Sequence, residues 1–144
     1  MKNVAVIGSS GAIGRAFLNA YIQDKDISNI YSISRTEVKS KDERITNINI
    51  DVTDEASVKA AASKIGDNSL DRLIVATGIL HTELFGPEKS IRDIKIENFI
   101  KIFSVNTFGP ALIGKYFLPL MTKNKKSIIA FLSARVGSIS DNKL

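Results

Sequence analysis

Short apolar runs alternate along the chain with longer segments whose apolar residues recur at helical spacing. The apolar runs predict five strands, at residues 4–7, 29–34, 45–50, 70–76 and 127–132. The helical spacing predicts helices that begin near residues 12, 53 and 96, the last reaching residue 121 with Pro110 and Pro119 bending or breaking it. Strands that alternate with helices four times indicate an α/β fold with a parallel sheet covered on both faces.

Three glycines, Gly8, Gly11 and Gly14, lie between the first strand and the first helix. The first lets the chain turn sharply, the second lets phosphates approach the backbone, and the third lets the helix pack close to the strand. The helix N-terminus then offers unpaired N–H groups to an anion. The alternative is a glycine turn that only connects two elements. The pattern favours a Rossmann-type, doubly wound sheet in three layers, α/β/α.

Ligands of such sheets bind at the carboxyl ends of the strands. There the sequence places Gly8, Arg35, Asp51, Thr77–Gly78 and Ser133. An NAD site usually has an acid about 20 residues beyond the glycines, whereas this chain has Ser34 followed by Arg35, whose guanidinium matches a 2′-phosphate. The alternative is a solvated arginine on a loop. Asp51 either accepts a hydrogen bond from the adenine amino group or forms a turn before the next helix.

Composition and charge narrow the range of partners. The chain has 144 residues, no cysteine, and a net charge of +5 spread along the sequence. This suits a small anionic ligand better than nucleic acid. No run of about 18 uninterrupted apolar residues occurs, so we expect no membrane span. The lack of cysteine fits a reducing compartment, and we expect a cytoplasmic protein.

Two polar residues are candidates for a catalytic role. His81 is the only histidine and falls on a predicted loop without a recognisable partner, so we interpret it as a loop residue. Asn106 interrupts an apolar helical stretch, where a buried amide must find partners. It either bends the helix and holds a water molecule or bonds a neighbouring backbone group.

The sequence resembles the short-chain dehydrogenase/reductases, and within them the C-factor-like, cell–cell signalling branch. The resemblance rests on the glycine turn 8–14, on Asp51-Val52-Thr53, on Val105-Asn106 and on residues 132–142. It covers the whole chain but only the N-terminal part of the family's domain. It implies an incomplete NAD(P)-binding Rossmann domain over residues 1–144, truncated after the fifth strand.

The resemblance also implies an NADP-dependent oxidoreductase that transfers a hydride between nicotinamide and a carbonyl or alcohol substrate. In the family a tyrosine protonates the carbonyl oxygen, a lysine four residues later lowers the tyrosine's pKa, a serine polarises the carbonyl and a helix asparagine holds a relay water. Asn106 matches the relay residue, and Ser133 is slightly favoured over Ser138 as the serine. The expected NADP(H)-binding residues are Gly8, Ser10, Gly11, Ile13, Gly14, Ser34, Arg35, Asp51, Val52, Ala76, Thr77 and Gly78.

The chain departs from the family pattern in several places. Ala12 stands where the family has its second glycine, Val75-Ala-Thr-Gly78 replaces Asn-Asn-Ala-Gly, and Ala134 takes the usual serine position. The Tyr-x-x-x-Lys pair is absent at the strand ends, and we regard Tyr21 and Lys25 as a coincidence of spacing on the first helix. We therefore expect that these 144 residues alone do not turn over. The alternative function is a non-catalytic nucleotide-binding or signalling module.

Apolar residues on more than one face of the 96–121 helix predict self-association. A single sheet cannot cover all of them, so a partner helix is expected. The resemblance implies a homodimer or homotetramer formed through this helix.

Overall fold

The computed structural model describes residues 1–83, 85–138 and 140. Its strands are β1 (Lys2–Ile7), β2 (Ile27–Ile33), β3 (Ile45–Ile48), β4 (Arg72–Val75) and β5 (Ile128–Phe131), and its α-helices are α1 (Ala12–Gln23), α2 (Glu55–Ala62), α3 (Ile96–Phe103) and α4 (Gly109–Phe117). Short 3₁₀ turns cover Ile91–Asp93, Leu118–Leu120 and Arg135–Gly137. The strands form one sheet in the order β3-β2-β1-β4-β5, and every neighbouring pair is parallel.

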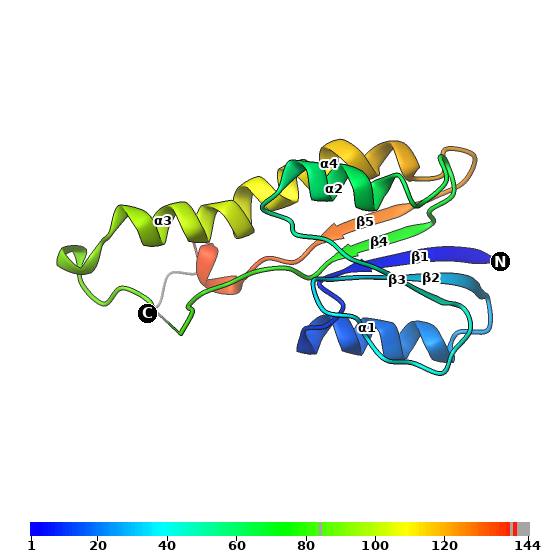
Figure 1. Ribbon diagram of the computed structural model, residues 1–144, viewed down its shortest axis with the longest axis horizontal. Coiled ribbons are helices and arrows are strands. Elements are labelled where there is room, and N and C mark those ends of the chain that lie inside the picture. The colour runs from blue at the N-terminus through cyan, green and yellow to red at the C-terminus, as the bar shows by residue number, and fades with distance from the viewer. Residues whose placement is uncertain (84, 139, 141–144) are drawn as a thin grey trace.

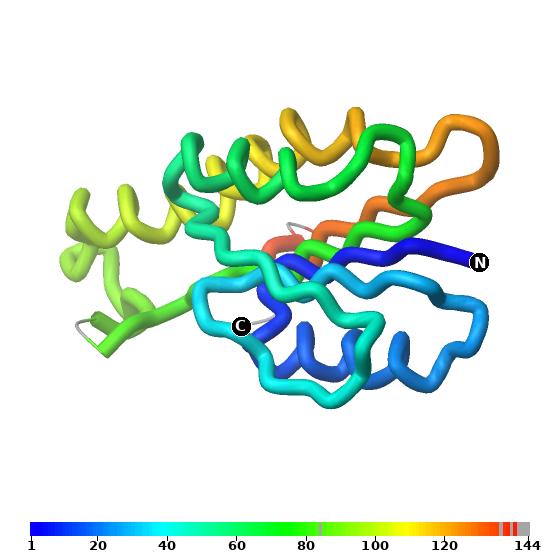
Figure 2. The backbone as a smooth tube through the Cα atoms, turned by 45° about the vertical axis from the view of Figure 1, so that its right-hand side comes forward, coloured from blue at the N-terminus to red at the C-terminus, as the bar shows by residue number. Residues whose placement is uncertain are grey.

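Helices cover both faces of this sheet. Helix α1 lies on one face, and α2 and α4 lie side by side on the other (Figures 1 and 2). The alternating residues of β1 separate two cores accordingly, because Val4 and Val6 pack on the α1 side while Ala5 and Ile7 pack on the side of α2 and α4. The three-layer, doubly wound α/β fold predicted from the sequence is thus confirmed.

The predicted alternation of strands and helices four times is wrong. Helices separate β1 from β2, β3 from β4, and β4 from β5, but β2 and β3 are joined by residues 34–44, which contain no helix. This segment is polar, and Val38 is the one hydrophobic residue in it that packs against the α1-side core. A segment with so little apolar surface gains little from folding into an amphipathic helix.

Several predicted element boundaries also shift. Strand β2 begins earlier than expected, whereas β3, β4 and β5 are shorter than the apolar runs that indicated them. Helix α2 is capped by the Asp54 carboxylate, which accepts a hydrogen bond from the Ala56 N–H at 3.0 Å, and not by the Thr53 hydroxyl. It ends at Ala62, four residues before Gly66, although Ile65 stays buried in the core.

The predicted helix 96–121 is divided into α3, a wider π-helical turn at Ser104–Phe108, and α4, which ends at Phe117, earlier than predicted, before the 3₁₀ turn at Leu118–Leu120. Pro110 lies at the start of α4, where its ring would collide with the carbonyl of Asn106 in a regular α-helix. The chain widens at this point, and the N–H of Gly109 bonds the Ser104 carbonyl five residues back. The bend directs α3 beyond the end of the sheet (Figure 1).

Candidate functional site

A cleft of about 770 Å³ opens at the carboxyl ends of β1, β2 and β4, between the glycine turn and α3. Most of the predicted ligand-binding residues line it: Gly8, Ser10, Gly11, Ser34, Arg35, Asp51, Val52, Ala76, Thr77 and Gly78. Ile13 and Gly14 lie beside the cleft on α1 and do not line it. The strand-end rule therefore brings together residues that are far apart in the sequence.

The glycine turn is shaped by close backbone packing. Gly8 has a φ of +84°, and a Cβ there would lie 2.9 Å from the carbonyl carbon and oxygen of Ala76. A Cβ on Gly14 would overlap the carbonyl oxygen of Gly8, so only glycine lets α1 begin so close to the end of β1.

The N-terminus of α1 is left open to a ligand. Gly11 is its N-cap residue, no side chain caps the helix, and its first turn contains no acid. The N–H groups of that turn have no partner within the helix, and the turn itself carries no acidic side chain. These features fit a phosphate group.

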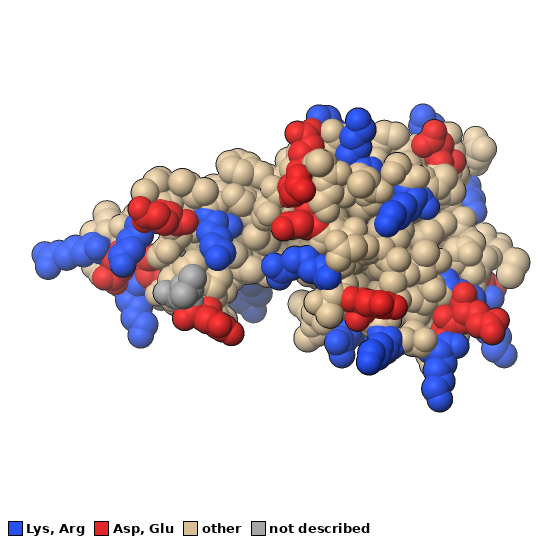
Figure 3. All heavy atoms as spheres, viewed as in Figure 1, with Lys and Arg blue, Asp and Glu red and all other residues tan. Residues whose placement is uncertain are grey.

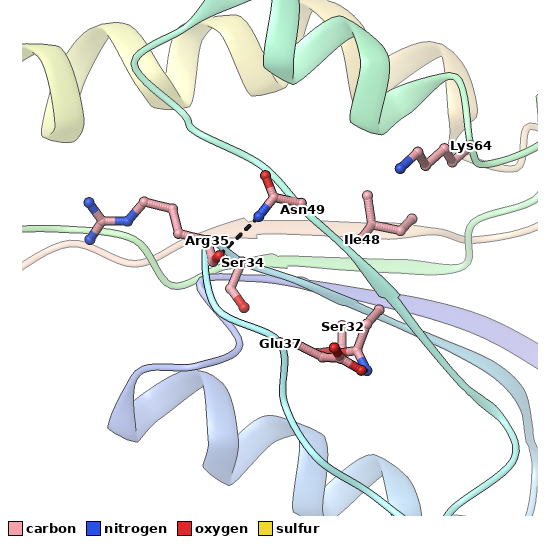
Figure 4. Close-up of a pocket in the computed structure, with 8 residues that line it drawn as sticks. Ser32, Ser34, Arg35, Glu37, Ile48, Asn49 and Lys64 are labelled. Atoms are coloured by element: carbon pink, nitrogen blue, oxygen red, sulfur yellow. Dashed lines mark hydrogen bonds between the residues drawn. The ribbon is translucent and has the colours of Figure 1, made fainter.

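Ser34 and Arg35 differ in their availability. The Ser34 hydroxyl is buried, donates a hydrogen bond to the Thr36 carbonyl at 2.6 Å and accepts one from Ser9 at 3.0 Å. Arg35 is exposed, and its guanidinium has no hydrogen bond or ion pair within the described chain. Figure 4 shows its side chain directed away from Asn49, whose amide donates to the Arg35 carbonyl at 2.9 Å. Of the two residues, Arg35 has the free donors that an anion needs.

Asp51 forms the turn that leads into α2. Its Oδ1 accepts hydrogen bonds from the hydroxyl and the backbone N–H of Thr53, at 2.7 Å and 2.9 Å. These two bonds lower the pKa of Asp51, and the positive charge of Arg35 lowers it further. The turn-forming interpretation is thus observed directly, while the carboxylate also borders the cleft. Val52 beside it is buried and packs against Gly109.

The end of β4 supplies an unpaired hydroxyl. Thr77 Oγ1 is buried and has no hydrogen-bond partner among the residues that the structure describes. Gly78 follows it, and a Cβ there would meet Asn106 Oδ1 at 3.6 Å, which is an ordinary contact. The protein itself therefore does not require glycine at position 78.

Asn106 lies in the π-helical turn and joins α3 and α4 to the loop after β4. Its Oδ1 accepts from the Ile79 N–H at 2.8 Å, and its Nδ2 donates to the Ile79 carbonyl at 2.7 Å. Of the two predicted interpretations, the structure shows the bond to a backbone group. The expectation that the amide is buried is wrong, since Asn106 is exposed, and it does not line the cleft.

The predicted serines lie outside the cleft. Ser133 follows β5 and is exposed, and the hydroxyl of Ser138 lies 3.1 Å from that of Ser140. Part of the segment 132–142 that carries the family resemblance, namely residues 139, 141 and 142, falls outside the described residues. His81 is exposed on its loop, as predicted.

Sequence reasoning missed one wall of the cleft, which is formed by α3 and the turn after it. Glu97, Ile100, Lys101 and Ser104 line the cleft from this side. Their spacing of three, one and three residues places them on one helical face, a signal that was present in the sequence. Ile50, Thr53, Ile79, Thr82 and Val105 complete the lining.

Other kinds of site find little support among the described residues. No group of three His, Cys, Asp or Glu side chains in this part of the chain is arranged to hold a metal ion. No helix described in the structure has the length and apolar character needed to cross a membrane. Figure 3 shows Lys and Arg interspersed with Asp and Glu over the visible face. In the same view the molecule is narrower between the sheet and α3.

A family model for the short chain dehydrogenases matches residues 2–142. Together with the sheet order and the strand-end cleft, this match establishes that the chain belongs to the short chain dehydrogenase family. Members of this family are oxidoreductases that bind a nicotinamide cofactor.

Individual relatives agree with this assignment. Short chain dehydrogenase tazN of Aspergillus terreus is 31% identical over 143 residues, which cover 91% of this chain and 30% of that protein. The uncharacterized oxidoreductase YxbG of Bacillus subtilis is 27% identical over 137 residues, covering 89% of this chain and 48% of YxbG. The chain thus spans about half or less of the length of these curated relatives.

A solved structure shows the same fold. The NADPH-bound carbonyl reductase from chicken fatty liver superposes with a TM-score of 0.83 at 23% identity, over 99% of this chain and 61% of that chain. At this identity the likeness concerns the fold, and it agrees with the three-layer architecture described above.

Proposed function

We propose that the chain is the nucleotide-binding part of an NADP-dependent oxidoreductase of the C-factor-like branch, acting in the cytoplasm on a small carbonyl or alcohol. The observation that carries the proposal is the cleft that joins an open helix N-terminus to Arg35, whose guanidinium has no ion pair or hydrogen bond among the described residues. When bound, the cofactor supplies the hydride. The N–H groups of the first turn of α1 hold its diphosphate, and Arg35 pairs with its 2′-phosphate.

Titration of NADPH and NADH against the wild type and Arg35→Ala by calorimetry tests the cofactor preference. A charged hydrogen bond contributes about 1.5–3 kcal/mol, so we expect NADPH to bind roughly 10- to 150-fold more tightly than NADH. Arg35→Ala should remove this preference and leave NADH binding intact. Lys41→Ala is the matched control, because Lys41 is an exposed cation of the same connection outside the cleft. Equal affinities in the wild type would contradict the NADP assignment.

The family resemblance implies a tyrosine as the proton donor, and no tyrosine lines the cleft among the residues that the structure describes. None of the chain's 3 tyrosines lines the cleft: Tyr21 is buried on α1, Tyr31 lies in β2, and Tyr116 donates to Glu55 from α4. General acid catalysis typically contributes about 10²–10⁴-fold. We therefore expect that residues 1–144 alone bind nucleotide weakly and do not turn over. Oxidation of NADPH by this chain at full enzyme rates with a carbonyl substrate would contradict the assignment.

A chain extended by about 100 residues, still within the size of one domain, should reduce carbonyls with NADPH. A Tyr-x-x-x-Lys pair in that extension favours the enzyme, and its absence favours the non-catalytic nucleotide-binding or signalling module. In the extended chain, Asn106→Ala should lower turnover more than cofactor affinity. Ser133→Ala and Ser138→Ala, tested separately, would identify the hydroxyl that polarises the carbonyl.

We further propose that the protein pairs through the 96–121 helix. Helix α3 exposes Ile96, Phe99 and Phe103, with exposed fractions of 65%, 37% and 47%. Apolar surface of this kind is typical of an interface. Light scattering at tens of micromolar should therefore detect a homodimer or homotetramer, and a monomer would count against this interface.

A further inference from the structure

Three serine hydroxyls form a buried chain behind the glycine turn. Ser32 donates to Ser9 at 3.0 Å, Ser9 donates to Ser34 at 3.0 Å, and Ser34 donates to the Thr36 carbonyl at 2.6 Å. A carbonyl oxygen only accepts, so the single hydrogen of Ser34 must point to Thr36 and that of Ser9 must point to Ser34. The direction of every bond in the chain is therefore fixed.

The middle bond of this chain joins the two parts of the cleft that would meet anionic groups. Ser9 follows Gly8 in the glycine turn, and Ser34 precedes Arg35. Main-chain bonds support the same junction, because the Gly8 N–H donates to the Ile33 carbonyl at 2.8 Å. Figure 4 shows the Ser34 side chain pointing toward the α1 side of the sheet, while the Arg35 side chain points away from Ser34.

The burial of these hydroxyls argues against a purely space-filling role. Ser9, Ser32 and Ser34 have exposed fractions of 0%, 1% and 7%. Buried hydroxyl groups are costly unless they are paired, whereas small apolar side chains would fill the same space without that requirement. Beyond the main-chain pairing of β1 with β2, these hydroxyls supply a side-chain bond between two residues that lie 25 positions apart.

We propose that the Ser9–Ser34 hydroxyl link sets the position of Arg35 relative to the glycine turn, and so determines how strongly the cleft prefers a ligand with a phosphate on the ribose 2′-position. The inference rests on the proposed function, since it assigns the link to the same nucleotide site. A ligand that spans both anionic subsites gains affinity when their separation is fixed before binding. Ser9 and Ser34 are positioning residues, which act through Arg35.

The test compares adenosine 2′,5′-bisphosphate with adenosine 5′-monophosphate, which differ only in the 2′-phosphate. Dissociation constants are measured by calorimetry for the wild-type chain and for Ser9→Ala, Ser34→Ala and Ser32→Ala. Ser32→Ala is the matched control, because it removes an equally buried hydroxyl and leaves the bonds from Ser9 to Ser34 and from Ser34 to Thr36 intact.

We expect the preference for the bisphosphate to fall about three- to tenfold in Ser9→Ala and Ser34→Ala and to stay at the wild-type value in Ser32→Ala. Ser34→Thr keeps the hydroxyl and should retain the preference. A variant that is merely less stable would bind both ligands more weakly by the same factor, so the ratio of the two dissociation constants would not change. If Ser9→Ala does not fold, Ser34→Ala decides the question.

Two results would overturn the inference. An unchanged ratio in the folded Ser9→Ala and Ser34→Ala proteins would show that the link does not position Arg35. An equal fall in Ser32→Ala would show that any buried hydroxyl in this region has the same effect. A wild-type chain without preference for the bisphosphate would instead refute the NADP assignment itself, so the two failures are distinguishable.

Discussion

The two ends of the sheet treat charged side chains in opposite ways. At the amino ends of the strands, Asp71 is buried, pairs with Lys125 at 2.6 Å and accepts from the Asn3 N–H at 2.9 Å. Arg44 at the same end bonds both carboxylate oxygens of Asp42 and the backbone carbonyls of three residues at the end of α1 and the start of β2 (Ile22, Asp24 and Ile27). These groups tie the elements together.

At the carboxyl ends some polar groups have no internal partner among the described residues. Helix α1 has no side-chain cap, Thr77 Oγ1 has no hydrogen-bond partner, and the Arg35 guanidinium has neither a hydrogen bond nor an ion pair within the described chain. Leaving buried polar groups unpaired costs stability, so a fold tolerates them where a ligand completes the bonding. The contrast separates the end that stabilises the fold from the end that we propose to bind the nucleotide.

The largest expected effect concerns the glycine turn at the carboxyl end of the sheet. Gly14→Ala places a methyl group onto the Gly8 carbonyl oxygen, and we expect it to lower the free energy of unfolding by about 3 kcal/mol. Gly114→Ala in α4 is the matched control, since a Cβ there meets nothing within 4 Å and should raise stability by about 0.5–1 kcal/mol. Urea unfolding measures both changes. Equal effects of the two substitutions would contradict the close packing of α1 on the glycine turn.

An intermediate effect is expected at the amino end. Burial acts to raise the pKa of Asp71, but the hydrogen bonds from Lys125 and Asn3 outweigh it, so the pKa of this carboxyl lies below its usual value. The carboxylate therefore contributes stability above pH ~4 that is lost as the pH falls through its lowered pKa. Asp71→Asn should cost about 1–3 kcal/mol at neutral pH and should flatten the acid part of the stability profile.

The control for this variant is Asp67→Asn, which neutralises an exposed acid nearby in the sequence. It should leave both the stability at pH 7 and the shape of the acid transition close to those of the wild type. An Asp71→Asn protein with the wild-type pH profile would refute the stabilising role of this carboxylate.

The smallest expected effect is a gain in stability. Thr77→Val replaces a buried hydroxyl that lacks a partner with a methyl group, and we expect the free energy of unfolding to rise by about 1 kcal/mol. The same substitution at Thr53 removes a hydroxyl that bonds Asp51 and should destabilise the chain. Thermal melts of the unliganded variants measure both. A loss of stability in Thr77→Val would mean that its hydroxyl is paired.

The sequence could predict the features that depend on short stretches of chain. The glycine turn, the strand identities and the position of Arg35 follow from local apolar runs, from the special conformations of glycine, and from the rule that parallel strands end at one edge. Those signals predicted the three-layer fold and, among the residues that line the cleft, Gly8, Arg35, Asp51, Thr77 and Gly78.

Other features arise only when distant segments meet. The Ser9–Ser34 link joins residues 25 positions apart, and Asn106 reaches Ile79 across 27 positions. Neither contact has a local pattern, because a serine or an asparagine is compatible with both an exposed and a bonded position. The wall formed by α3 likewise depends on the bend before Pro110, which sets where the helix points.

The sequence by itself therefore determined the class of fold, the glycine turn and the charge offered at the end of β2. The tertiary structure decided which hydroxyl groups are hydrogen-bonded. It also decided that the Arg35 guanidinium has no ion pair within the described chain and that α3 forms one wall of the cleft. The physical reason is that local conformational preferences act within a few residues, whereas the pairing of polar groups depends on distances that only the packed sheet and helices fix.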